Sequence, residues 1–134
     1  MRRIALLPCL LVLILLCSCG KVDHLTVDYG NSVRYTKQEM EAAIRVIKRE
    51  FLTWSGCELY TLSYFGDECS ERELDHCNEL GKGHFDQCIV FSSSFRSPKN
   101  GGNGFEADRV YTDWTWTLAR QGTGAWKLVD WGYA

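Results

Sequence analysis

The stretch from Thr36 to Trp54, TKQEMEAAIRVIKREFLTW, decides the fold of this chain. Thr36 and Glu39 have the Thr-x-x-Glu spacing of a capping box, which begins a helix. Apolar residues then recur at helical spacing and form one stripe: Met40, Ala43, Ile44, Ile47, Phe51 and Trp54. We therefore expect a long amphipathic helix from residue 36 to about residue 53, and its stripe must be buried against another layer.

The residues that follow can supply that layer. Four segments combine alternating polarity with aromatic and β-branched residues, which is typical of strands; they are residues 57–65, 87–96, 109–121 and 125–133. Gly122-Thr123-Gly124 joins the last two at hairpin length, and such short links favour antiparallel pairing. Between the first two strands, Ser70 and Glu73 form a second capping box, so we expect a short helix there that ends at Gly81.

We therefore predict an α+β fold, with one long N-terminal amphipathic helix on a curved, mainly antiparallel sheet of about four strands, plus a short second helix. The arrangement resembles the cystatin-like and NTF2-like architectures. The closing segment Trp126–Tyr133, WKLVDWGY, is typical of the way NTF2-like domains end. Residues 20–35 lack helical periodicity, and we interpret residues 19–35 as a tether ahead of a single domain, residues 36–134.

The first 18 residues are predicted to be a signal peptide. Arg2 and Arg3 precede an apolar run from residue 4 to residue 16, which is too short to cross a bilayer but has the length of a secretory segment. The following LCSCG, residues 16–20, resembles the lipobox of bacterial lipoproteins. That resemblance implies that Cys19 is the N-terminal residue of the mature chain and carries acyl chains such as palmitate, which attach it to the membrane. An uncut signal anchor, or plain secretion after cleavage near Cys17 or Gly20, is the alternative.

Charge narrows the class of partner. Without residues 1–18 the chain has 13 basic and 17 acidic residues, a net charge of −4. Nucleic acids and anionic membrane surfaces favour basic patches, so neither is an expected partner. We expect the lipid alone to hold a small globular domain at the extracytoplasmic face of the cell membrane.

The whole mature chain also resembles a family of small, uncharacterised bacterial lipoproteins. Besides the lipobox, the matching segments are Gly56–Leu59, Asp86–Phe91, Phe95–Gly102 and Asp130–Tyr133. These motifs are structural, and the resemblance implies no activity.

Four cysteines, Cys57, Cys69, Cys77 and Cys88, lie after the leader. An even number outside the cytoplasm suggests disulfides, and we prefer the pairs Cys57–Cys88 and Cys69–Cys77. Four reduced thiols are the alternative. A zinc site that adds His76 and His84 is disfavoured, because the spacing lacks a Cys-x-x-Cys pair and adjacent helical residues point about 100° apart.

The third expected strand carries the candidate binding residues Tyr111, Asp113, Trp114 and Trp116. Alternation places both tryptophans on one face, and Tyr111 and Asp113 on the other. An exposed aromatic row suits an envelope protein, a peptide or a glycan. We therefore predict a non-catalytic binding module without a cofactor. The alternative is a small NTF2-like enzyme in which Asp113 or Asp130 lies in an apolar pocket and acts as a general base.

Overall fold

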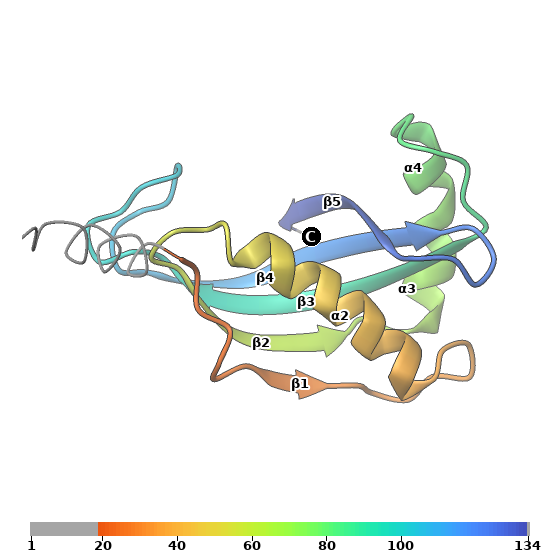
Figure 1. The fold of residues 1–134 in the computed structure, drawn as a ribbon, viewed down its shortest axis with the longest axis horizontal. Helices are drawn as coiled ribbons and strands as arrows, with labels where there is room; N and C mark the ends of the chain where they lie inside the picture. The colour runs from red at the N-terminus through yellow and green to blue at the C-terminus, as the bar shows by residue number, and fades with distance from the viewer. Residues whose placement is uncertain (1–18, 134) are drawn as a thin grey trace, which may run out of the picture.

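A computed structural model describes residues 19–133 and has an α+β fold (Figure 1). One open sheet has the strand order β1-β2-β3-β4-β5. Strand β1 pairs parallel to β2, and the other neighbours are antiparallel. The elements are β1 (Thr26–Asp28), α2 (Lys37–Phe51), β2 (Glu58–Tyr64), α3 (Asp67–Arg72), α4 (Leu74–Glu79), β3 (Gln87–Arg96), β4 (Val110–Arg120) and β5 (Lys127–Tyr133). The predicted leader, with Cys9 and Cys17, lies outside the described residues.

Helix α2 forms for the reason that the sequence indicates, but it is shorter than expected. The Thr36 hydroxyl accepts the Glu39 backbone N–H, and the Glu39 carboxylate accepts the Thr36 N–H, so the capping box is complete. The helix has 15 residues and ends at Phe51, so the prediction of a long helix is wrong. Its apolar stripe packs on the sheet and is buried from Met40 to Phe51.

The sheet has five strands and not about four, because the segment predicted to be a tether joins the domain. The Gly20 N–H donates to the Leu52 carbonyl at 3.0 Å, and the Lys21 N–H donates to the Cys57 carbonyl at 2.9 Å. Farther along, Thr26–Asp28 add β1 beside β2. A strand of three residues carries too little alternation to be recognised in a sequence.

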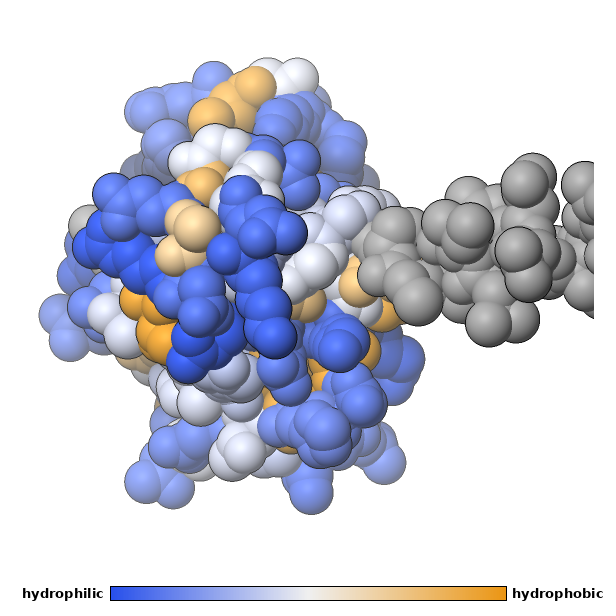
Figure 2. Space-filling view, turned by 90° about the vertical axis from the view of Figure 1, so that its left-hand side faces the viewer, coloured by the Kyte–Doolittle hydropathy of each residue, from blue (hydrophilic) through white to orange (hydrophobic). Residues whose placement is uncertain are grey.

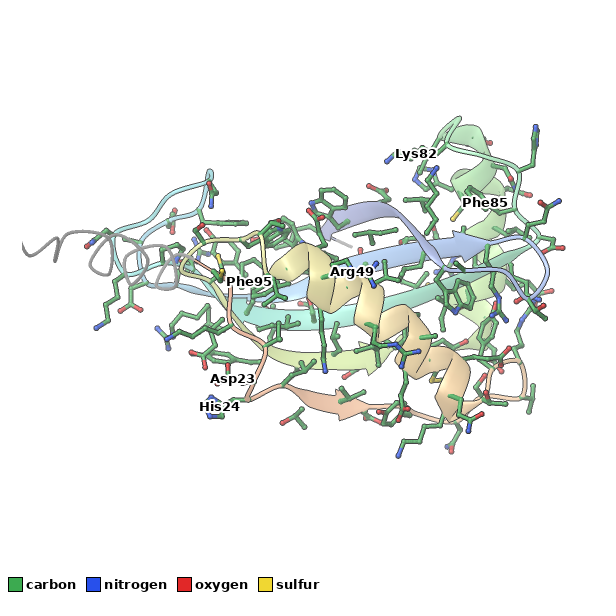
Figure 3. All side chains as sticks on the ribbon, in the orientation of Figure 1. Asp23, His24, Arg49, Lys82, Phe85 and Phe95 are labelled. Atoms are coloured by element: carbon green, nitrogen blue, oxygen red, sulfur yellow. The ribbon has the colours of Figure 1, made fainter. Side chains whose placement is uncertain are left out.

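Helices α3 and α4 cover the opposite face of the sheet from α2. Phe91 belongs to the core under α2, whereas its neighbour Val90 belongs to a second core that contains residues of α3 and α4. Figure 3 shows Phe95 at the end of the molecule where α2 ends, and Phe85 and Lys82 at the other end. The second capping box is not used, because α3 begins at Asp67 and places Ser70 inside the helix, 1% exposed.

The predicted disulfide pairing is wrong. All four cysteines of the domain are free and buried. Glu58 pairs with Arg96, so the antiparallel register places Cys57 at the far end of β3 from Cys88, about 26 Å away at 3.3 Å per residue. Cys69 does not pair with Cys77 either: the Cys77 Sγ atom lies 3.4 Å from the Cys88 Sγ atom.

Candidate functional site: an aromatic cleft

A cleft opens beyond the C-terminal end of α2, over the first residues of β4 and the last residues of β5. Its volume is about 720 Å³. Three parts of the chain form its walls: the turn after α2, the β3–β4 loop, and the facing ends of β4 and β5. The lining residues are Thr53, Trp54, Asn103, Gly104, Phe105, Tyr111, Trp114, Trp131, Gly132 and Tyr133.

Aromatic rings pack against one another around the cleft. The Trp54 ring lies 5.9 Å from Trp114, at 90°, and 5.7 Å from Phe105. The Tyr133 ring lies 5.2 Å from Trp114, its partner on the neighbouring strand. At the rim, Trp131 is 42% exposed and Tyr133 is 63% exposed, so both rings are available to a ligand.

The Ser97 side chain fixes the β3–β4 loop, which forms one wall of the cleft. Ser97 is buried, its hydroxyl donates to the Glu106 carbonyl, and it accepts the Arg109 N–H at 2.9 Å. The Glu106 N–H donates to the Tyr111 hydroxyl at 3.0 Å. These bonds close the loop and hold Phe105 against Phe95, with ring centroids 5.2 Å apart.

Trp116 lies beneath the cleft and supports it. This side chain is fully buried, and its indole N–H donates to the Ser93 hydroxyl at 2.8 Å. The Ser93 hydroxyl donates in turn to the Trp114 carbonyl at 2.8 Å. The Trp116 ring lies 5.1 Å from Trp54 and 6.3 Å from Trp131, so it sets the positions of two cleft residues from below.

The structure brings together only part of the binding set predicted from sequence. Tyr111 and Trp114 line the cleft, Trp116 lies under it, and Asp113 is exposed outside it. Tyr111 faces the same side as Trp114, contrary to the predicted alternation, because β4 has a bulge. Ser93 pairs with Trp114 and Phe95 with Tyr111, so two residues of β4 oppose one residue of β3, and Asp113 has a φ of 58°.

Asp130, the other predicted base, lies on the opposite face of the sheet. Its carboxylate is 3.2 Å from His76 Nε2, and both side chains are close to half exposed. This hydrogen bond is the main reason why the pKa of His76 is raised above its ordinary value. The pair borders a smaller pocket of about 260 Å³ that also contains Cys69, whose pKa is raised by burial, so that thiol stays protonated.

Sequence reasoning missed most of the cleft. The helical spacing predicts that Trp54 belongs to the apolar stripe of the helix, whereas the structure places it beyond the end of α2. Phe105 was not singled out, although an aromatic residue inside a glycine-rich loop is an unusual choice unless the ring packs on something. Trp131 and Tyr133 are not among the predicted binding residues, and the structure places both at the rim.

Among residues 19–133, no group of three or more His, Cys, Asp or Glu side chains is arranged to hold a metal ion. None of the described helices has the length and apolar character needed to cross a membrane. Comparisons of the chain with protein-family models, with curated proteins and with solved structures gave no match. The geometry of the cleft therefore carries the functional argument.

Proposed function

We propose that this protein is a non-catalytic binding module, attached to the extracytoplasmic face of the membrane through lipid on Cys19, and that it binds its ligand in the aromatic cleft. The observation that carries the proposal is the lining of the cleft. Apolar pockets with few polar groups are the usual form of a ligand site. Here two rim rings are exposed, and the polar side-chain groups of the lining are those of Thr53 and Asn103, the tyrosine hydroxyls and the tryptophan indole N–H groups.

The chemistry of the lining favours binding over catalysis. No Asp, Glu, Lys, Arg, His or Cys side chain is among the lining residues of the cleft. Asp113 lies outside it, and Asp130 is paired with His76 on the other face of the sheet. A general base must reach its substrate within hydrogen-bond distance, and neither aspartate lines this site.

The proposed family relationship follows from the same features. We place the domain with small bacterial lipoproteins whose fold is cystatin-like or NTF2-like, in which one helix lies on a curved, mainly antiparallel sheet. The lipobox at residues 16–20 and the single helix across the main sheet face support this proposal.

The test uses the mature chain, residues 19–134, made without lipid as the Cys19→Ala variant and labelled with fluorotryptophan. It is titrated with three probes: an N-acetylglucosamine trimer, an extended tyrosine-containing peptide, and dihexanoylphosphatidylcholine. We expect at least one probe to shift the fluorine NMR signals of Trp54, Trp114 and Trp131. The signal of Trp126, which borders a different pocket, should stay in place and serves as the internal control.

A matched pair of variants separates the cleft from the rest of the surface. Trp131→Ala should weaken binding of the active probe about tenfold or more, as truncation of a contact aromatic does at binding sites. Phe65→Ala removes another exposed ring, 44% exposed and outside the cleft, and should leave binding unchanged. If none of the three probes shifts the cleft signals, the proposed function is wrong.

A further inference from the structure

The chain enters the domain beside the aromatic cleft. Gly20 directly follows the proposed lipid site and is hydrogen-bonded to the Leu52 carbonyl. A Cβ on Gly20 would lie 2.1 Å from the Phe51 carbonyl oxygen and 3.0 Å from that of Trp54. Glycine is therefore required for the close packing at this position. Thr53 and Trp54, the residues next to this contact, line the cleft.

This packing leaves no flexible spacer between Cys19 and the domain. Acyl chains on Cys19 would enter the bilayer one residue away from Gly20, which packs on the turn after α2. That turn forms one wall of the cleft. The anchor would therefore hold this end of the domain against the membrane. A flexible spacer of about ten residues would instead allow an average separation of about 17 Å and free reorientation.

We infer that the ligand of the aromatic cleft is an acyl chain of a membrane lipid, which enters from the bilayer on which this end of the domain rests. The inference depends on the proposed function and names its ligand. The lining is uncharged and largely apolar, as an acyl chain requires. Trp131 and Tyr133 at the rim are residue types that prefer the boundary between lipid and water.

The surface around the cleft is suited to rest on lipid headgroups without entering the apolar layer. Figure 2 views this end of the molecule and shows a mostly hydrophilic surface with smaller apolar areas. Such a surface stays hydrated among headgroups. Only the cleft would then receive an apolar chain, and the domain would extract or sense single lipids without inserting itself.

The experiment uses the full chain, processed and lipidated by an exporting bacterial host and placed in phosphatidylcholine–phosphatidylglycerol vesicles that contain a lipid with a photoreactive group on its acyl chain. After illumination, mass mapping should find adducts on the cleft residues Trp54, Phe105 and Tyr133, and far fewer near Phe65 and Trp126. Insertion of about ten Gly and Ser residues between Cys19 and Gly20 should reduce the cleft adducts several-fold, since the cleft is then released from the membrane.

Three results would overturn the inference. Cleft residues without adducts would exclude a membrane lipid as the ligand. Adducts undiminished by the insertion would show that the short link does not deliver the chain. A second sample carries the photoreactive group on the acyl chains of Cys19 and not on the vesicle lipid. Cleft labelling in that sample alone would show that the protein's own anchor occupies the cleft. If the glycan or peptide probe still shifts the cleft tryptophan signals, the proposed function survives each of these results.

A separate observation concerns the second core. Cys77 on α4 and Cys88 at the start of β3 are 0% and 2% exposed, and their Sγ atoms lie 3.4 Å apart. Cys69 belongs to the same core, but no thiol contact is formed with it, and Cys57 lies in the other core. The fold therefore selects one pair among the three thiols of this core.

We propose that Cys77 and Cys88 form a disulfide when the exported chain folds. The oxidant is the disulfide of a thiol–disulfide oxidoreductase. The thiolate of one cysteine attacks it and releases one oxidoreductase thiol, and the other cysteine then displaces the second thiol. Each of the two protein thiols loses its proton, and the oxidoreductase leaves with two thiols. The bond closes a short loop and should lower the equilibrium constant for unfolding by about 100-fold.

Non-reducing mass mapping of the full chain from an exporting host tests this pairing. We expect one linked peptide pair that joins Cys77 to Cys88, with Cys57 and Cys69 as free thiols. Recovery of four free thiols would overturn the proposal, and so would a link from Cys69 to either partner. Reduction of the bond in the intact protein should lower the unfolding midpoint in urea, which gives a second measurement.

Discussion

Replacement of Glu39 by alanine is expected to lower the free energy of unfolding by about 3 kcal/mol or more, because it leaves a buried guanidinium without its carboxylate. Arg120 is only 7% exposed, and its Nη2 donates to Glu39 Oε1 at 2.7 Å. The guanidinium also stacks 4.2 Å from the Trp126 ring and donates to Gln87, and these contacts remain in the variant. Glu39 closes the capping box of α2 as well, so the helix start weakens at the same time. Urea unfolding followed by tryptophan fluorescence measures the loss.

The control is the exposed ion pair of Arg96 and Asp108, whose side chains are 40% and 54% exposed. Asp108→Asn should cost less than about 1 kcal/mol, since exposed pairs contribute little. Glu39→Gln, the matched neutral substitution, should cost more than Asp108→Asn because its partner is buried. Equal costs for the two would contradict the assignment of Arg120 as a buried charge that depends on Glu39.

The same pair predicts a pH dependence. The pKa of Glu39 is lowered, chiefly by the hydrogen bond from the Thr36 backbone and then by Arg120. A carboxyl with a lower pKa in the folded state contributes its full stability above the unfolded value of about 4.3 and loses it as the pH falls through the folded pKa. The wild type should therefore lose stability more steeply in acid than Glu39→Gln. Equal acid slopes would contradict this linkage.

The main elements were predictable because each rests on a local signal. The Thr36–Glu39 box and the periodic stripe begin α2 at the expected residue, and strand β3 has the predicted bounds, Gln87–Arg96. The length of α2 was not predictable, because Leu52 and Thr53 continue a permissible helical sequence. The chain leaves the helix at this point and contacts Gly20, which comes from the N-terminal part of the domain. The Gly20 N–H donates to the Leu52 carbonyl, and Gly20 packs against the Trp54 carbonyl oxygen.

The cleft was only partly predictable, because it depends on three structural features that involve residues far apart in the sequence. The bulge at Asp113 turns Tyr111 to the Trp114 side, and strict alternation cannot anticipate a bulge. The Ser97 hydrogen bonds hold Phe105 against Phe95, so the β3–β4 loop forms one wall of the cleft. The early end of α2 then leaves Trp131 and Tyr133 uncovered.

Trp116→Ala is expected to cost about 3–5 kcal/mol in the free energy of unfolding, because it removes the largest fully buried side chain of the core. Its effect on the cleft is indirect. The ring does not line the cleft, but Trp54 and Trp131 pack on it, and its indole N–H binds the Ser93 hydroxyl that holds the Trp114 carbonyl. The cavity left by the substitution should let the Trp54 and Trp131 rings move toward the core. Probe binding should therefore weaken even under conditions where the variant is folded.

Trp116→Phe separates these two effects, since it keeps an aromatic support but removes the indole N–H. We expect a smaller loss of stability than for alanine, near-normal binding, and a displaced fluorine signal for Trp114, because Ser93 loses one of its two partners. Trp131→Ala provides the opposite case: its ring is 42% exposed, so binding should fall with a much smaller change in stability. If Trp116→Ala destabilised the domain no more than Trp131→Ala does, Trp116 could not be the buried support of the cleft.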